Sequence, residues 1–198
     1  MNAAVITETR NIAGIQFTIR QHLEKIPSDF ELIIFHGKNK DQFKEFDCEK
    51  HEVNISSISG YNAFMTDYMF WKRLLKYDRV LIFEWDSRIL REGIEEFYKL
   101  DYVGAPWKFQ HKGGNGGLSL RNPRVMLETI ERVPYHEIHG YEDVYFSNNM
   151  KGKLAPREVC EKFSVETIFK LGTWGCHAIE NWLSQRECEL ILNQYDAA

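Results

Sequence analysis

The sequence predicts an α/β protein with a mostly parallel central sheet, and three observations lead to that class. Short apolar runs alternate with amphipathic helical stretches. The first three segments follow the order strand, helix, strand, which is the unit of a parallel sheet. Residues 80–83 form an uninterrupted apolar run, typical of a strand buried on both faces. With 198 residues, the chain is expected to form a single domain over residues 1–198.

The N-terminal part is predicted to contain two strands joined by a helix. Residues 3–6 and 30–35 are the apolar runs, and residues 11–26 have apolar side chains at helical spacing. Asn11 can cap this helix. Gly37, in the turn after the second strand, lets the backbone approach a ligand. Neither GxGxxG nor GxxxxGK[ST] occurs, so the Rossmann and P-loop fingerprints are both absent.

The middle of the chain is predicted to bring in the central strand. Residues 43–54 suggest a short helix and a short strand. Residues 59–75 suggest a helix whose aromatic stripe is more typical of the core than of a binding site. The central strand at 80–83 is followed by an amphipathic helix over 92–100 and a short strand over 102–104.

The rest of the chain continues the alternation. Strands are expected directly after the glycine-rich segment and over 163–169, and helices over 123–133, from 142, from 155 and over 184–195. Pro123 stands near a first helical turn, where proline is tolerated. Ser184 and Glu187 form a capping box for the last helix.

Composition narrows the class of partners and the compartment. The net charge of −4 gives no basic field that would attract nucleic acid. No apolar stretch approaches the roughly 20 residues that span a bilayer, and the N-terminus lacks the features of a signal peptide. The four cysteines show neither CxxC nor zinc spacing, so free thiols and a cytoplasmic location are expected.

Glu84 and Asp86 follow the central strand with one residue between them. Ligands of α/β proteins bind at the carboxyl ends of such strands. An acid-x-acid pair there can hold a divalent cation, which in turn can hold a diphosphate. The alternative is that both are ordinary polar residues at a strand exit.

Residues 113–117 contain four glycines. Ordering such a segment costs about 0.5–1 kcal/mol per glycine relative to alanine. Such a segment either lets the backbone pass close to a ligand or forms a flexible surface loop.

Two further signals lie near the C-terminal half. Glu142 and Asp143 begin a helix, where they either complement the helix dipole or supply a general base. His177 follows a glycine-flanked Trp174 and is either structural or a ligand.

Several of these blocks, taken in order, resemble a small glycosyltransferase-like family with the GT-A (nucleotide-diphospho-sugar transferase) fold. The matching blocks are residues 8–10, 81–87, 101–107, 114–121, 142–143 and 175–177. The resemblance covers nearly the whole chain, and the glycine block is its more specific part. Because that family is mostly uncharacterised, the resemblance implies a fold and a class rather than a substrate.

The resemblance implies a metal site. Glu84 and Asp86 match the acid-x-acid motif that holds Mn²⁺ or Mg²⁺ against the diphosphate of a nucleotide sugar. The first acid is usually Asp, so Glu84 binds either the metal or the ribose, and Asp86 is the firmer ligand. His177 matches the late histidine that completes such sites, and carboxylate plus imidazole suits Mn²⁺.

The resemblance also implies donor and acceptor residues. Asp143 or Glu142 would be the base of an inverting enzyme and would take the proton of the acceptor hydroxyl. Trp85 adjoins the acid pair and either stacks on a sugar or belongs to the core. The residues expected at the donor are Thr7, Glu8, Arg10, Gly37, Glu84, Trp85, Gly114, Asn115, Gly116 and Gly117.

The expected function is therefore metal-dependent transfer of a sugar from a nucleotide-diphosphate donor, with a UDP-sugar as first choice, to a glycan or other hydroxyl acceptor. Two alternatives remain open at this point. One is a non-catalytic nucleotide- or carbohydrate-binding module on the same fold. The other is a nucleotidyltransferase, against which the lack of a basic glycine-rich loop near the N-terminus counts.

Overall fold

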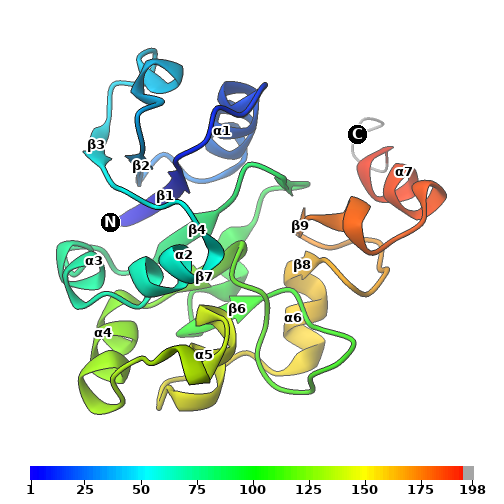
Figure 1. Ribbon diagram of the computed structural model, residues 1–198. Helices are drawn as coiled ribbons and strands as arrows, with labels where there is room; N and C mark the ends of the chain where they lie inside the picture. The colour runs from blue at the N-terminus through cyan, green and yellow to red at the C-terminus, as the bar shows by residue number, and fades with distance from the viewer. Residues whose placement is uncertain (194–198) are drawn as a thin grey trace.

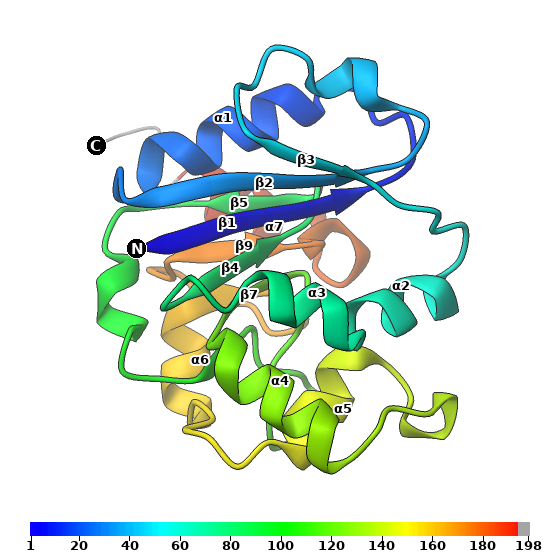
Figure 2. The ribbon, with the colours of Figure 1, turned by 90° about the vertical axis from the view of Figure 1, so that its left-hand side faces the viewer.

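A six-stranded sheet forms the centre of the computed structural model, which describes residues 1–193 (Figure 1). In the order β3-β2-β1-β4-β7-β6, its strands are Glu49–Glu52, Phe30–His36, Asn2–Glu8, Val80–Phe83, Leu118–Arg121 and Tyr102–Gly104. Neighbouring strands are parallel except at β7, which runs antiparallel to both β4 and β6. Figure 2 shows β3, β2, β1 and β4 side by side. The predicted α/β class with a mostly parallel sheet is confirmed.

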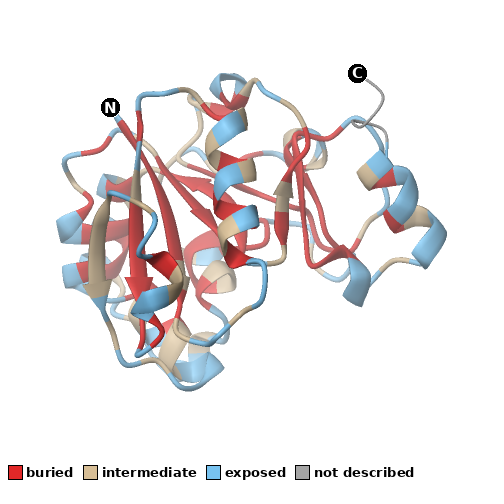
Figure 3. Ribbon diagram, turned by 90° about the horizontal axis from the view of Figure 1, so that it is seen from above, coloured by how far each residue is buried: buried red, intermediate tan, exposed pale blue. Residues whose placement is uncertain are grey.

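Apolar clusters cover both faces of this sheet, because successive side chains of β1 and β4 point to opposite faces. Ala4 and Leu81 belong to the cluster under α1 (Ile15–Lys25) and α6 (Arg157–Phe163). Val5 and Ile82 belong to the opposite cluster. The helices of that second face are α2 (Ile58–Met65), α3 (Tyr68–Arg73), α4 (Pro123–Arg132) and α5 (Glu142–Asn149). Figure 3 shows the buried residues gathered in the strands and the exposed ones on the outer sides of the helices.

A second, three-stranded sheet joins the C-terminal part of the chain to the end of β4. Its order is β5-β9-β8, with strands Ser87–Ile89, Gly175–His177 and Ser164–Val165. Strand β9 is antiparallel to β5 and parallel to β8. Helix α7 (Gln185–Asn193) packs on this sheet through Cys188 and Ile191. The short 3₁₀ turns are Lys40–Phe43, Ile94–Phe97, Glu137–His139 and Ile179–Asn181.

Several predicted elements have different bounds in the structure. Helix α1 begins at Ile15 after Gly14, whose φ is 79°, so Asn11 does not cap it. The predicted helix over 59–75 is two helices, because Asp67 Oδ1 accepts the amides of Met69 and Phe70 and starts α3 anew. The predicted helix over 92–100 is only a 3₁₀ turn, Ile94–Phe97.

The last strands also differ from the prediction. Helix α6 runs to Phe163, and β8 contains only Ser164 and Val165 of the predicted 163–169 strand. Strand β9 was not predicted, since a strand of three residues that begins with a glycine carries almost no periodic signal.

The predicted capping box before α7 is confirmed. The Ser184 amide donates to Glu187 Oε2 at 2.9 Å, and the Glu187 amide donates to Ser184 Oγ at 3.4 Å. The predicted helix end at residue 195 lies outside the described residues. All four cysteines are free. Within residues 1–193, no helix has the length and apolarity needed to cross a bilayer.

Candidate active site

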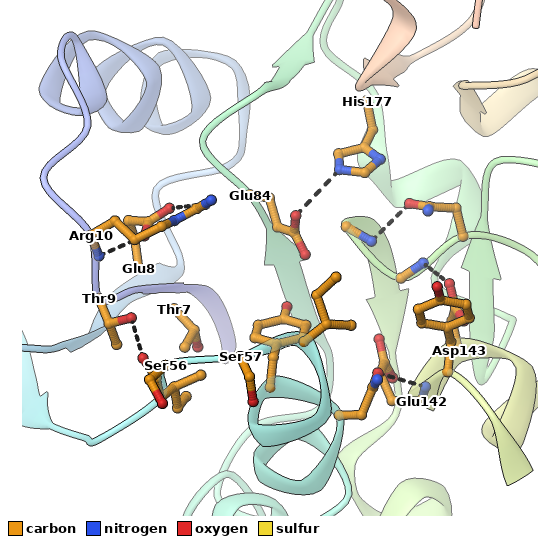
Figure 4. Close-up of a pocket in the computed structure, with 18 residues that line it drawn as sticks. Thr7, Glu8, Thr9, Arg10, Ser56, Ser57, Glu84, Glu142, Asp143 and His177 are labelled. Carbon is orange, nitrogen blue, oxygen red and sulfur yellow. Dashed lines mark hydrogen bonds and ion pairs between the residues drawn. The ribbon is translucent and has the colours of Figure 1, made fainter. Parts of the chain in front are cut away.

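A cavity of about 510 Å³ lies where β1 and β4 end, between the start of α2, the glycine-rich segment and the start of α5 (Figure 4). Most of the predicted site residues line it, namely Thr7, Glu8, Arg10, Glu84, Asn115, Gly116, Gly117, Glu142, Asp143 and His177. Asp86 lies beside His177, at the same end of β4. Asp86, Gly37, Trp85 and Gly114 are not among the lining residues.

The small sheet places His177 beside the acid pair. In register, His177 pairs with Ser87 of β5, so that Asp86 precedes its partner by one residue. The chain is held there by the Ala178 amide, which donates to the Asp86 carbonyl at 3.2 Å. Ala178 has φ 48° and is the only non-glycine residue with positive φ in residues 1–193. Such strained residues concentrate at functional sites, where surrounding structure holds them.

Glu84, Asp86 and His177 converge on one point. His177 Nε2 lies 3.3 Å from Asp86 Oδ1 and 3.5 Å from Glu84 Oε2. One ligand atom from each of the three residues lies within 4.8 Å of the others. Both ring nitrogens of His177 and Asp86 Oδ1 are buried without a hydrogen-bond partner. Buried polar atoms normally have partners, and a divalent cation suits this donor set. The residues therefore fit a metal site.

The charges of the cluster are strongly coupled. Burial alone would lower the pKa of His177, but Asp86, Glu166 and Glu84 act together to raise it well above 6.5. Burial raises the pKa of Asp86, yet the contact with His177 outweighs it and the net pKa is lowered. The site thus places a positive charge between carboxylates. A metal cation would take over that charge, since a ligating imidazole must lose its proton.

Glu142 takes part in a buried ion pair. Arg121 is 0% exposed, and its Nη1 and Nη2 donate to Glu142 Oε2 and Oε1 at 2.6 and 2.8 Å. Arg121 Nε donates to Ser119 Oγ, and its guanidinium lies 4.9 Å from the centre of the Tyr102 ring. The amide of Glu142 donates to Asn62 Oδ1 at 3.0 Å. Both carboxylate oxygens of Glu142 are therefore engaged by Arg121.

Asp143 has a different environment. Its Oδ2 accepts the Gly116 amide at 3.1 Å, and its Oδ1 accepts the Val144 amide at 2.7 Å. Burial first, and the charge of Glu142 second, raise the pKa of Asp143 to about 7. A carboxyl group with this pKa can exchange a proton near neutral pH.

The glycines bring backbone close to the protein's own site residues. A Cβ on Gly117 would lie 2.2 Å from His177 Nε2, and one on Gly116 would lie 2.2 Å from Glu142 Oε1. At Gly114 the nearest atom would be the Gly104 oxygen, and at Gly37 the Thr9 oxygen. The residues of the glycine segment are thus required for packing, and Gly116 and Gly117 also form part of the cavity wall.

The other end of the cavity is built on the end of β1. Glu8 is buried and accepts from the Arg10 side chain at 2.7 and 2.9 Å, which fixes an otherwise exposed guanidinium. Thr9 Oγ1 donates to the Ile55 carbonyl and ties this turn to the segment before α2. Trp85 is 38% exposed and its carbonyl accepts from Thr18 Oγ1.

Sequence reasoning missed several residues of the site, among them Tyr61, Asn62 and Glu166. Tyr61 and Asn62 line the cavity, although the aromatic stripe to which Tyr61 belongs was expected in the core rather than in a binding site. Burial and the charges of Glu84 and Glu142 raise the pKa of Tyr61 well above 10. Glu166 contacts His177 Nδ1 at 3.5 Å. No sequence motif marks Glu166 as a neighbour of His177. Only the pairing of β8 with β9 in the structure shows that the two residues are close.

Three solved structures of glycosyltransferases share this fold. LgtC, a galactosyltransferase solved with donor and acceptor sugar analogs, has a TM-score of 0.57 and 11% identity over 96% of this chain and 95% of that chain. The apo-form glycosyltransferase GlyE of Streptococcus pneumoniae has a TM-score of 0.56 and 12% identity over 93% of this chain and 55% of the GlyE chain. S. aureus TarS (residues 1–349), solved with UDP-GlcNAc, has a TM-score of 0.51 and 14% identity over 77% of this chain and 55% of the TarS chain.

The fold is thus that of GT-A-type glycosyltransferases, and this chain spans about half the length of the GlyE and TarS chains. The chain belongs to the family described as "Protein of unknown function (DUF5672)", which matches residues 42–177. That segment includes the acid pair, the glycine segment, Asp143 and His177. No curated protein matches the sequence.

Replacing Arg121 with Met should destabilise the fold strongly, because it leaves the Glu142 carboxylate buried without a partner. We expect a loss of about 3–5 kcal/mol in the free energy of unfolding, measured by urea denaturation. The double variant Arg121→Met, Glu142→Leu should recover part of the loss. If the free energy of unfolding of Arg121→Met were within about 1 kcal/mol of the wild-type value, the importance of this ion pair would be contradicted.

Asp143 should make stability depend on pH. Its pKa in the folded state is about 7, whereas an unfolded aspartate has a pKa of about 3.9. The folded state therefore binds this proton more tightly, and the stability it contributes below pH 4 is lost as the pH rises towards 7. In Asp143→Asn this decline should be absent from denaturant midpoints measured between pH 4 and 7.5. Parallel pH profiles for the two proteins would contradict the raised pKa.

Proposed function

We propose that this protein is a metal-dependent glycosyltransferase that takes a sugar from a nucleotide-diphosphate donor. The observation that supports it best is the convergence of Glu84, Asp86 and His177, with buried unpartnered atoms, at the carboxyl end of β4. In this fold class, that is the edge where a ligand binds. The adjoining cavity has a volume of about 510 Å³, which is within the usual range for small-molecule sites.

The donor would lie along the cavity from the β1 end to the acid pair. Asp86, His177 and Glu84 would hold a Mn²⁺ or Mg²⁺ ion, whose charge would stabilise the leaving diphosphate as a Lewis acid. Thr7, Glu8 and Arg10 would bind the nucleoside, and the ion pair between Arg10 and Glu8 already holds these two side chains in place. The likeness to TarS, which was solved with UDP-GlcNAc, supports a UDP-sugar as the first donor to test.

The acceptor would lie at the Asp143 end. Asp143 would take the proton of an acceptor hydroxyl as that oxygen attacks the anomeric carbon, and a pKa of about 7 suits this role. A single displacement of this kind inverts the anomeric centre and forms no covalent enzyme intermediate. Glu142 would act only through its pair with Arg121. Tyr141 lines the same cavity, is 60% exposed and offers a ring face to a glycan or another hydroxyl acceptor.

Calorimetry should detect Mn²⁺-dependent binding of UDP to the wild-type protein. Asp86→Ala should abolish the metal-dependent part, because it removes a ligand from a three-residue set. Asp41→Ala, which changes an exposed acid in a 3₁₀ turn, should bind as wild type does. If no nucleoside diphosphate binds in a metal-dependent way, the proposed metal-assisted mechanism is wrong.

Asp143→Asn should separate catalysis from binding. We expect donor hydrolysis or transfer to fall by about 10²–10⁴-fold, the usual contribution of a general base. The affinity for Mn²⁺ and UDP should stay close to that of wild type, because Asp143 contacts none of the three metal-site residues. Donor hydrolysis at the uncatalysed background rate in both proteins would instead indicate a binding module, and equal turnover above that rate would show that Asp143 is not the base.

A further inference from the structure

We propose that Glu166 is a positioning residue, which holds the Nδ1 proton of His177 so that Nε2 faces Glu84 and Asp86. The part of this inference that concerns a cation rests on the function proposed above. The part that concerns the orientation and proton of the ring does not.

Strand pairing brings Glu166 to His177. Strand β9 lies between β5 and β8, and Cys176 pairs with Val165. The next residues along the two parallel strands are His177 and Glu166. His177 thus has Asp86 on the β5 side and Glu166 on the β8 side, and each acid comes from the segment next to a strand end.

The two carboxylate groups face different nitrogens of the ring. Glu166 Oε1 lies 3.5 Å from Nδ1, whereas Asp86 Oδ1 and Glu84 Oε2 lie 3.3 and 3.5 Å from Nε2. Glu166 is 6% exposed, and its Oε2 is buried without a partner. Because the two ring nitrogens point in different directions, an ion bound at Nε2 would not be bound by Glu166 through this contact.

The glycine segment fixes the Glu166 carboxylate. Asn115 Nδ2 donates to Glu166 Oε1 at 2.9 Å, and Asn115 Oδ1 accepts the Gly117 amide at 2.8 Å. The second contact sets the amide orientation, so the NH₂ group must face Glu166. Thr167, the next residue, accepts the Lys108 amide at 3.0 Å and donates to the Pro106 carbonyl. The two residues that follow β8 are therefore both held by hydrogen bonds, Glu166 to Asn115 and Thr167 to Pro106 and Lys108.

This arrangement decides which nitrogen can bind a cation. A neutral imidazole carries one proton, and the group beside the protonated nitrogen selects the tautomer. A buried carboxylate beside Nδ1 would accept that proton's hydrogen bond and leave the Nε2 lone pair directed at the acid pair. Carboxylates that orient ligating histidines in this way typically contribute 10–100-fold to metal affinity.

The test uses three variants of the full chain. Glu166→Leu removes the acceptor, and Glu166→Gln keeps an amide oxygen of similar reach but removes the charge. Glu158→Gln, an exposed acid on α6, is the matched control. Nitrogen NMR of histidine side chains reports the Nδ1 proton, and the His177 signal is identified by its absence from His177→Gln. Calorimetry with Mn²⁺ alone reports metal affinity.

We expect the slowly exchanging Nδ1 proton signal of His177 to be lost in Glu166→Leu and shifted in Glu166→Gln. Mn²⁺ affinity should fall by about 10–100-fold in Glu166→Leu and by less in Glu166→Gln. Glu158→Gln should match wild type in both measurements. If Glu166→Leu does not fold, the shift in Glu166→Gln decides the question.

An unchanged His177 signal in the Glu166 variants would overturn the inference. If wild type binds no Mn²⁺, the metal in the proposed function is wrong, while the NMR signal still shows whether Glu166 holds the Nδ1 proton. If the signal responds but Mn²⁺ affinity does not, Glu166 does not position the ring for a cation and the inference is wrong in that respect.

Discussion

The pairing of β9 between β5 and β8 is the constraint on which the site depends. This pairing contains only a few residue pairs, yet it brings His177 next to the end of β4 at Phe83, which is far away in the sequence. The register matters more than the number of bonds, because a shift by one residue would turn His177 to the other face. The strained φ of Ala178 and the hydrogen bond from its amide to the Asp86 carbonyl fix the end of this strand.

A second constraint is the buried pair of Arg121 and Glu142. It joins β7 to the start of α5 and places Asp143 next to the glycine segment. Isolated buried charges are costly, so each partner depends on the other. The glycines permit this crowding, since side chains at Gly116 and Gly117 would overlap Glu142 and His177. Fold stability and site geometry are therefore coupled through the same residues.

The sequence predicted those parts of the fold that have strong local signals. The four consecutive apolar residues Val80–Phe83 can be recognised as a central strand, and Pro123 marks the start of α4. Short elements have no such pattern. Strand β9 depends on pairing with distant segments. The break at Asp67 and the late start of α1 are local, but they come from one capping side chain and one glycine rather than from a periodic pattern. The acid pair and His177 could be proposed as partners by resemblance, and the structure brings them together.

The role of Glu142 could not be separated from that of Asp143 in the sequence. Two adjacent acids at a helix start are equivalent as a pattern, and only the position of Arg121 distinguishes them. Glu166 was missed for a related reason, because its neighbour is set by strand register rather than by spacing along the chain.

Anomalous scattering from crystals soaked with Mn²⁺ and UDP would locate the metal ion in the protein. We expect a manganese peak between Glu84, Asp86 and His177, with ligand distances of about 2.0–2.6 Å. A peak elsewhere in the molecule, or none in crystals that contain bound UDP, would contradict it.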